Sequence, residues 1–189
     1  MKLYMVRHGQ SVANFNKQHV GWGQVPLTEK GEDDARGAGE ILKNYSFDKV
    51  YSSDLLRAMQ TQKIALPNET AELCELIREV GVGSLSGKKF EDCEKELGEE
   101  YINLRTLGDF RSFGGEDKNT HRERVGKFFD MVAKQNYESV AAFTHAGTIL
   151  RAFDLTVCEG EEIPFPKNCG IFLFEFKDGK WSFIKEITE

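Results

Sequence analysis

Two of the four histidines follow short apolar runs that are predicted to be buried strands. His8 follows the run Lys2–Val6, with Arg7 between them, and His145 follows the run Ser139–Thr144. A neutral imidazole can act as a nucleophile and form a covalent intermediate. Arginine suits a phosphate ligand because its planar guanidinium group binds two oxygens at once. The two strand ends therefore predict a site in which histidine attacks phosphorus and arginine neutralises the phosphoryl charge.

Two further residues are candidates for the same chemistry. Arg57 lies in the first turn of a helix expected over Asp54–Ala65, at the edge of the sheet where His8 is expected. Glu79 precedes a glycine-rich stretch, which lets the backbone approach a ligand closely. Phosphoryl transfer needs an acid that protonates the leaving group, and a carboxyl group can fill this role. Taken alone, each is a weak candidate, because surface arginines are common and the chain has many glutamates.

Other chemistries are not supported by the residue spacing. HxH, HExxH and DxH patterns, which would mark metal ligands, are missing from the sequence. The segment GVGSLSGKK resembles a phosphate loop, but its glycines are wrongly spaced and Lys89 stands where Ser or Thr would hold magnesium. The dinucleotide fingerprint lacks its third glycine. We expect no metal and no cofactor, and we expect His19 and His121, in polar contexts, to lie at the surface.

Strands and helices are predicted to alternate, which indicates an α/β fold: a three-layer sandwich with a mostly parallel central sheet flanked by helices. In such sheets ligands bind beyond the carboxyl ends of the strands. Ser52 or Ser53 is expected to cap the helix that follows the second strand. The predicted strands are 2–6, 47–51, 71–76 and 139–144, the helices begin at 28, 54, 119 and 148, and a terminal hairpin pairs 171–176 with 181–187 through a turn at Asp178-Gly179.

Length and composition limit the remaining possibilities. The 189 residues predict a single domain over 1–189, with a cap-like insertion at about 88–113 that contains two weak helical stretches. The net charge of −6 argues against a nucleic-acid or membrane partner. The four cysteines form no CxxC pair and are expected to be free thiols. The apolar run at the N-terminus is too short for a signal peptide or membrane span, so we expect a cytoplasmic protein. Oligomeric state cannot be read from the sequence.

Several longer segments resemble a known family. RHGQSVANFNKQHVGWGQVPLTEKG resembles the opening signature of the histidine phosphatase superfamily, the phosphoglycerate-mutase-like group. YSSDLLRAMQT, LIREVGVGSLSG, GGED and FTHAGTILR resemble the later blocks of that family, in the same order and over nearly the whole chain. A single Arg-His-Gly triplet would be weak evidence, whereas an ordered set is strong.

The resemblance implies a phosphoglycerate-mutase-like fold and a role for each matching residue. His8 would take the phosphoryl group, Glu79 would be the proton donor, and Glu116 would support the site. The residues implied to bind phosphate are Arg7, Asn14, Arg57 and His145. The chain departs from the family pattern at three positions, which puts fine specificity in doubt but not activity: Gln10, Gln24 and Ala146.

The expected activity is metal-independent hydrolysis of phosphomonoesters through a covalent phosphohistidine. Phosphoglycerate mutase-type transfer is the alternative, and a phosphate-binding module without turnover also stays open. The short chain favours hydrolysis, because the mutases of this family resemble longer chains with a larger insertion. The expected partner is a small phosphorylated metabolite. Candidates for the specificity pocket are Phe15, Trp22, Phe90, Tyr101, Arg111 and Phe113.

Overall fold

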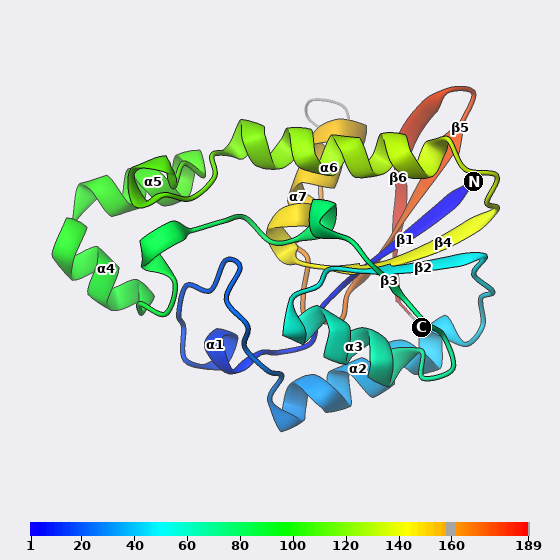
Figure 1. Ribbon diagram of the computed structural model, residues 1–189, viewed down its shortest axis with the longest axis horizontal. Coiled ribbons are helices and arrows are strands. Elements are labelled where there is room, and N and C mark those ends of the chain that lie inside the picture. The colour runs from blue at the N-terminus through cyan, green and yellow to red at the C-terminus, as the bar shows by residue number, and fades with distance from the viewer. Residues whose placement is uncertain (158–161, 189) are drawn as a thin grey trace.

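Strands and helices alternate along the chain as the hydrophobic pattern predicts (Figure 1). The structure is a computed structural model that describes residues 1–157 and 162–188. Short 3₁₀ turns lie at Glu75–Ile77, Gly83–Leu85 and Arg111–Phe113. The strands and helices are β1 (Lys2–Arg7), α1 (Val12–Phe15), α2 (Glu29–Leu42), β2 (Lys49–Ser52), α3 (Leu56–Ala65), β3 (Glu72–Leu73), α4 (Phe90–Leu97), α5 (Glu99–Leu107), α6 (Lys118–Ala133), β4 (Ser139–Thr144), α7 (Ala146–Thr156), β5 (Ile171–Lys177) and β6 (Lys180–Ile187).

A six-stranded sheet with the order β3-β2-β4-β1-β5-β6 forms the centre of the molecule. Strands β3, β2, β4 and β1 are parallel, and the hairpin β5–β6 adds two antiparallel strands beside β1. Arg7 at the end of β1 is in register with Thr144 at the end of β4, and Ser52 of β2 is opposite Phe143. The carboxyl ends of three neighbouring strands therefore meet at one edge, which is where the predicted chemistry lies.

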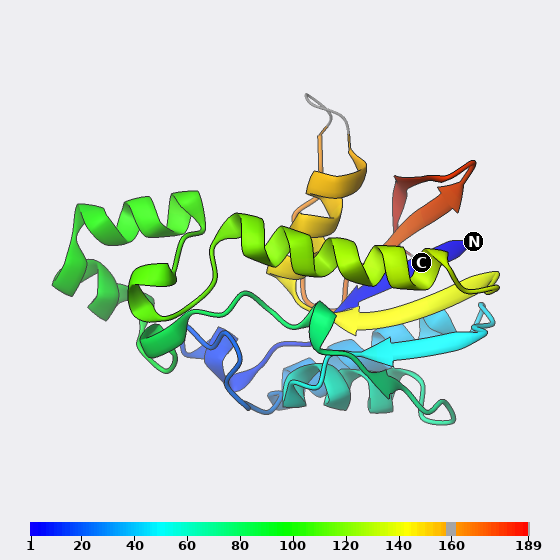
Figure 2. The same ribbon diagram turned by 45° about the horizontal axis from the view of Figure 1, so that its top comes forward.

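Helices cover both faces of the sheet, so the predicted three-layer sandwich is confirmed (Figure 2). Leu3 and Met5 of β1 join a core that includes side chains of α6 and α7, whereas Tyr4 and Val6 join a second core with α2. This alternation follows from the two-residue period of a strand. Each buried side chain of this size contributes about 1.5–3 kcal/mol to stability. The two cores hold β1 rigidly, and with it the residues that follow its end.

Helix α3 begins two residues later than predicted, and neither serine caps it. Leu55 occupies the N-cap position, so Ser52 and Ser53 lie before the first turn. The first-turn N–H of Leu56 instead donates to the side-chain oxygen of Gln24, at 2.7 Å. A residue far away in sequence thus supplies the acceptor that helix termini require. The prediction of a serine cap is wrong because local sequence does not show such partners.

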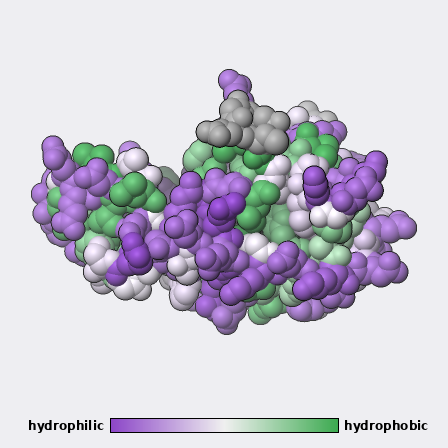
Figure 3. Space-filling view, turned by 90° about the horizontal axis from the view of Figure 1, so that it is seen from above, coloured by the Kyte–Doolittle hydropathy of each residue, from purple (hydrophilic) through white to green (hydrophobic). Residues whose placement is uncertain are grey.

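Residues 88–113 form a lobe, which we call the cap, and its small core is shared with residues 80–85 (Figure 1). Helices α4 and α5 pack around Tyr101, which is 1% exposed. Figure 3 shows apolar residues among hydrophilic ones on this lobe, at the left of the view. The prediction that His19 lies at the surface is wrong: its side chain is buried under the cap, and its Nε2 lies 2.6 Å from the Tyr101 hydroxyl. This hydrogen bond joins the cap to the loop after α1.

Three of the four cysteines, Cys74, Cys93 and Cys169, are free thiols, and Cys158 lies outside the described residues. Within 1–157 and 162–188, the helices are all too short or too polar to cross a bilayer.

Candidate active site

His8 directly follows β1 and is almost completely buried. Its backbone N–H donates to the carbonyl of Thr144 at 2.9 Å, which holds it at the junction of β1 and β4. Its Nδ1 lies 2.7 Å from the carbonyl oxygen of Gly9, so Nδ1 carries the hydrogen and Nε2 carries the lone pair. Burial and the positive charges of Arg57 and Arg7 hold the pKa of His8 well below its usual range. The imidazole is therefore neutral at pH 7, as a nucleophile must be.

Arg57 contacts the Nε2 edge of this ring. Its Nε lies 3.2 Å from Nε2 of His8, and its two terminal nitrogens donate to the carbonyls of Gly23 at 3.1 Å and Gly21 at 2.9 Å. The side chain is buried, and burial lowers the pKa of Arg57 to about 10. The guanidinium group thus remains charged at neutral pH. The loop carbonyls fix its plane beside His8.

Arg7 and His145 adjoin His8 and carry unused hydrogen-bonding atoms. Nη1 of Arg7 donates to the carbonyl of Pro166 at 2.6 Å, and Nε2 of His145 lies 2.9 Å from the hydroxyl of Ser53. The rings of His145 and His8 have centroids 5.1 Å apart. Within the described residues, Arg7 Nε and His145 Nδ1 are buried without a partner. Unpaired buried polar atoms are costly, so these two atoms mark the surroundings of His8 as incompletely satisfied.

Glu79 is held between two backbone amides. Its Oε1 accepts from the N–H of Val80 at 2.9 Å and its Oε2 from the N–H of Gly147 at 3.2 Å. A Cβ atom at Gly147 would lie 2.2 Å from Oε1, so a larger residue there would displace the Glu79 carboxylate. Burial lowers the pKa values of Arg7 and Arg57. The nearby carboxylate of Glu79 raises both values and offsets part of this effect.

The segment that carries Glu79 is held by a partly buried ion pair. Arg124 of α6 donates to both carboxylate oxygens of Glu116, at 2.9 and 2.8 Å, and to the carbonyls of Arg78 and Glu79 at 2.9 and 3.1 Å. Glu116 in turn accepts from the N–H of Gly81 at 2.8 Å. Glu116 thus lies where the resemblance implied a supporting residue. Arg124 was not singled out by sequence, because nothing local distinguishes it from other helix arginines.

His121 also lies in this region, and the prediction that it is a surface residue is wrong. It is 1% exposed, and its Nε2 lies 3.1 Å from the hydroxyl of Thr148, which donates to the carbonyl of Arg78. Burial and the charges of nearby arginines lower the pKa of His121 to about 3. The signal was present in the sequence: His121 precedes Val125 and Phe128 by four and seven residues, and so continues the buried stripe of α6.

Five of the six predicted site residues line one cavity of about 190 Å³, which we call the His8 cavity: Arg7, His8, Asn14, Arg57 and Glu79. His145 is fully buried and lies against His8 without appearing among the lining residues. Asn14 Oδ1 accepts from the N–H of Ser11 at 3.1 Å, closing a capping box at the start of α1. Its amide NH₂ therefore remains as the group that can donate to a ligand.

The predicted specificity residues are mostly placed elsewhere. Phe90 lines the His8 cavity. Tyr101 is buried in the cap core instead, because its hydroxyl pairs with His19. Arg111 pairs with Asp109 and Asp117 on the surface. The predicted residues absent from the cavity lining are Phe15, Trp22, Tyr101, Arg111 and Phe113.

A family model described as the histidine phosphatase superfamily (branch 1) matches residues 3–186. The chain belongs to this superfamily. A 2,3-bisphosphoglycerate-dependent phosphoglycerate mutase of Parvibaculum lavamentivorans is 36% identical over 136 residues, which cover 68% of this chain and 65% of the mutase. The chain thus spans slightly less than two thirds of the length of that relative.

Two solved structures, named as a mutase and a phosphatase, have the same fold. The phosphoglycerate mutase from Bacillus anthracis superposes with a TM-score of 0.85 at 22% identity, covering 97% of this chain and 91% of the mutase. The alpha-ribazole phosphatase from Shigella flexneri superposes with a TM-score of 0.82 at 22% identity, covering 97% and 95%. Because a mutase and a phosphatase fit almost equally well, the fold alone does not distinguish transfer from hydrolysis.

In this histidine phosphatase superfamily chain, the site combines a neutral imidazole, two guanidinium groups and a carboxyl group around one cavity. The part of the chain that the structure describes contains no group of three or more His, Cys, Asp or Glu side chains that could hold a metal ion. The arrangement provides positive charge from arginine, which suits a phosphoryl group.

Proposed function

We propose that the protein hydrolyses phosphomonoesters, without a metal ion, through a covalent phosphohistidine on His8. One observation carries the proposal: Nδ1 of His8 donates to the Gly9 carbonyl, and Nε2 faces the guanidinium group of Arg57 at 3.2 Å. A phosphate oxygen bound there would accept the hydrogen bond that Arg57 Nε otherwise donates to Nε2 of His8. Its binding then frees the Nε2 lone pair for in-line attack.

The reaction has two steps in which protons and bonds balance. In the first, Nε2 of His8 attacks phosphorus, the bond to the ester oxygen breaks, and Glu79 gives its proton to the leaving alkoxide. In the second, Glu79 takes a proton from water, the water oxygen attacks phosphorus, and the P–N bond breaks. Arg7 and Arg57 neutralise charge on the equatorial oxygens throughout. Ser53 can donate to Nε2 of His145, which places a hydrogen on Nδ1 for the same oxygens.

Mutase-type transfer is the second candidate, because the relative from Parvibaculum lavamentivorans is named as a mutase. A mutase must exclude water from the phosphohistidine and hold a second anionic group. Among the described lining residues of the His8 cavity, the cations are Arg7 and Arg57, and both adjoin His8. The two helices of the cap have only eight and nine residues. These features support hydrolysis.

Trapping of the intermediate tests the proposal. The protein is incubated with ³²P-labelled p-nitrophenyl phosphate in EDTA and quenched in alkaline denaturant. We expect a base-stable, acid-labile phosphoenzyme that is absent from a His8→Ala variant. Failure to label, with phosphate still bound, would indicate a binding module. Incubation with 3-phosphoglycerate distinguishes the mutase: rapid isomerisation with little free phosphate would overturn hydrolysis.

A further inference from the structure

Beyond the phosphate-binding residues, the lining of the His8 cavity combines hydrophobic side chains with Ser11, Gln18 and His19. Five large hydrophobic side chains contribute to its lining: Val20, Val80, Val82, Phe90 and Phe110. Its volume of about 190 Å³ is below the range of roughly 300–1,000 Å³ typical of sites for drug-sized ligands. The cavity therefore suits a small substrate whose leaving group contacts hydrocarbon.

The charged side chains that line this cavity all have a proposed role in the phosphoryl transfer itself. Among the described lining residues these are Arg7, Arg57 and Glu79. Arg57 is fixed beside His8 by the two loop carbonyls, and Arg7 is fixed by the carbonyl of Pro166. A carboxylate or second phosphate on the leaving group would find no further cation in the lining. Such a group would lose part of its hydration without gaining an ionic partner.

His19, the remaining histidine of the lining, does not supply a positive charge. Burial and the charge of Arg105 lower the pKa of His19 to about 4, so its ring is neutral at pH 7. Its Nε2 is already paired with the hydroxyl of Tyr101, and its ring packs edge-on against Phe90 with centroids 4.7 Å apart. His19 therefore presents a neutral aromatic surface.

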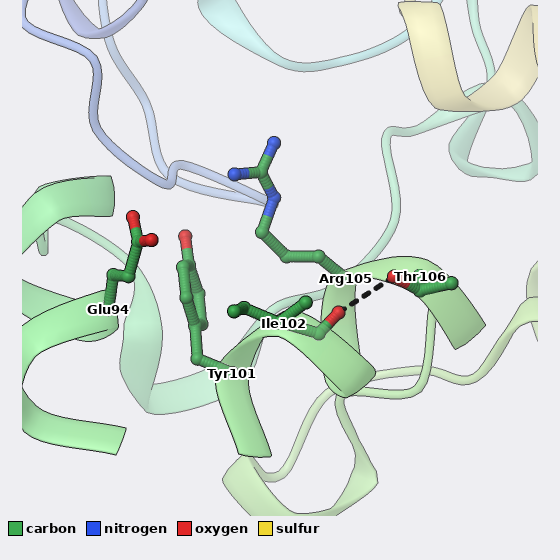
Figure 4. A pocket seen from close by; sticks show the side chains of 5 residues that line it. All are labelled: Glu94, Tyr101, Ile102, Arg105 and Thr106. Atoms are coloured by element: carbon green, nitrogen blue, oxygen red, sulfur yellow. Dashed lines mark hydrogen bonds between the residues drawn. The ribbon is translucent and has the colours of Figure 1, made fainter. Parts of the chain in front are cut away.

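Arg105 of the cap contacts the aromatic ring of Phe90, a residue of this wall, but does not itself line the His8 cavity. Its guanidinium group lies 5.2 Å from the ring centre of Phe90 and 5.7 Å from that of Tyr101. The side chains of Arg105 and Tyr101 extend in the same direction from α5 (Figure 4). Arg105 lines a separate cavity, together with Glu94, Tyr101, Ile102 and Thr106.

We propose that the substrates are phosphomonoesters of small, uncharged apolar alcohols, with aromatic ones preferred, and not esters of hydroxy acids or bisphosphates. This inference rests on the proposed hydrolysis at His8. The valines and phenylalanines remove an apolar leaving group from water, which is favourable in proportion to the apolar area buried. An aromatic group gains further from edge-to-face contact with Phe90 and Phe110.

Three esters with similar alkoxide leaving groups test the proposal: 3-phenylpropyl phosphate, 4-(phosphonooxy)butanoate and ethyl phosphate. We expect kcat/KM for the phenylpropyl ester to exceed that for the carboxylated ester by at least about tenfold. Val20→Lys, which places a cation in the wall, should raise kcat/KM for the carboxylated ester and reduce the preference for the phenylpropyl ester over it. Equal rates, or a preference for the carboxylated ester that Arg105→Gln removes, would overturn the proposal.

A matched pair of variants distinguishes an effect of the cavity wall on substrate preference from general destabilisation of the cap. Phe90→Ala should lower kcat/KM for the phenylpropyl ester by about tenfold more than it lowers kcat/KM for ethyl phosphate. Leu107→Ala, which removes a 66%-exposed side chain of α5 that does not line the cavity, should change neither. Equal losses on both esters in Phe90→Ala would count against the proposal. If ethyl phosphate is neither hydrolysed nor able to form the phosphoenzyme, the proposed function itself fails.

Discussion

Replacement of Arg124 by Met tests the idea that a partly buried ion pair positions Glu79, the proposed catalytic acid. The side chains of Arg124 and Glu116 are 15% and 11% exposed, and Arg124 also donates to the backbone on either side of Arg78. Removing one partner of a buried pair costs about 3–5 kcal/mol, because the other charge is left uncompensated. Since both groups keep some contact with water, we expect Arg124→Met to lower the free energy of unfolding by about 2–4 kcal/mol.

For a chain of this length, each kcal/mol lowers Tm by about 2–4 °C, so Arg124→Met should melt about 5–15 °C below wild type. The double variant Arg124→Met/Glu116→Gln should recover part of this loss, because no unpaired charge remains. Arg122→Met, on the same helix with an exposed side chain, is the control and should change stability by less than about 0.5 kcal/mol. Thermal unfolding followed by circular dichroism measures all three.

Catalysis provides the second measurement for Arg124→Met. A loosened Glu79 segment should lower kcat more for an alkyl phosphate, whose alkoxide needs protonation, than for p-nitrophenyl phosphate. A variant that melts within about 2 °C of wild type, or that loses both activities equally, would refute a positioning role.

Three further predictions concern the site residues. Arg57→Ala should lower kcat/KM by about 10²–10³-fold, the scale of losing one charged donor to the transition state, and steady-state assays beside an Arg36→Ala surface control would check this. Glu79→Gln should slow ethyl phosphate far more than p-nitrophenyl phosphate; similar losses on both would remove Glu79 from the acid role. His121 has a pKa of about 3 in the folded protein and about 6.5 in the unfolded chain. Between about pH 3 and pH 6.5 this histidine is therefore protonated in the unfolded chain but not in the folded protein. The free energy of unfolding should therefore decrease as pH falls from 6.5, by up to about 1.4 kcal/mol per unit from this group, and urea titrations at pH 7 and 5 should show a smaller decrease in His121→Gln.

The sequence by itself determined the architecture and the centre of the site. Apolar runs and helical stripes are local patterns, so they located most strands and helices to within a few residues. Parallel strands bring their carboxyl ends to one edge, so two histidines at strand ends could be expected to meet, and their ring centroids lie 5.1 Å apart. The resemblance to the superfamily then pointed to Asn14, Glu79 and Glu116.

Only the tertiary structure decided which side chains support that centre. Gln24 caps a helix 32 residues away, Arg124 reaches carbonyls about 46 residues away, and His19 pairs with Tyr101 at a separation of 82. Polar side chains of this kind have no local periodicity, because their partners come from other elements. The apolar wall of the His8 cavity is likewise assembled from four separate stretches of chain, and its chemistry appears only when they are packed together.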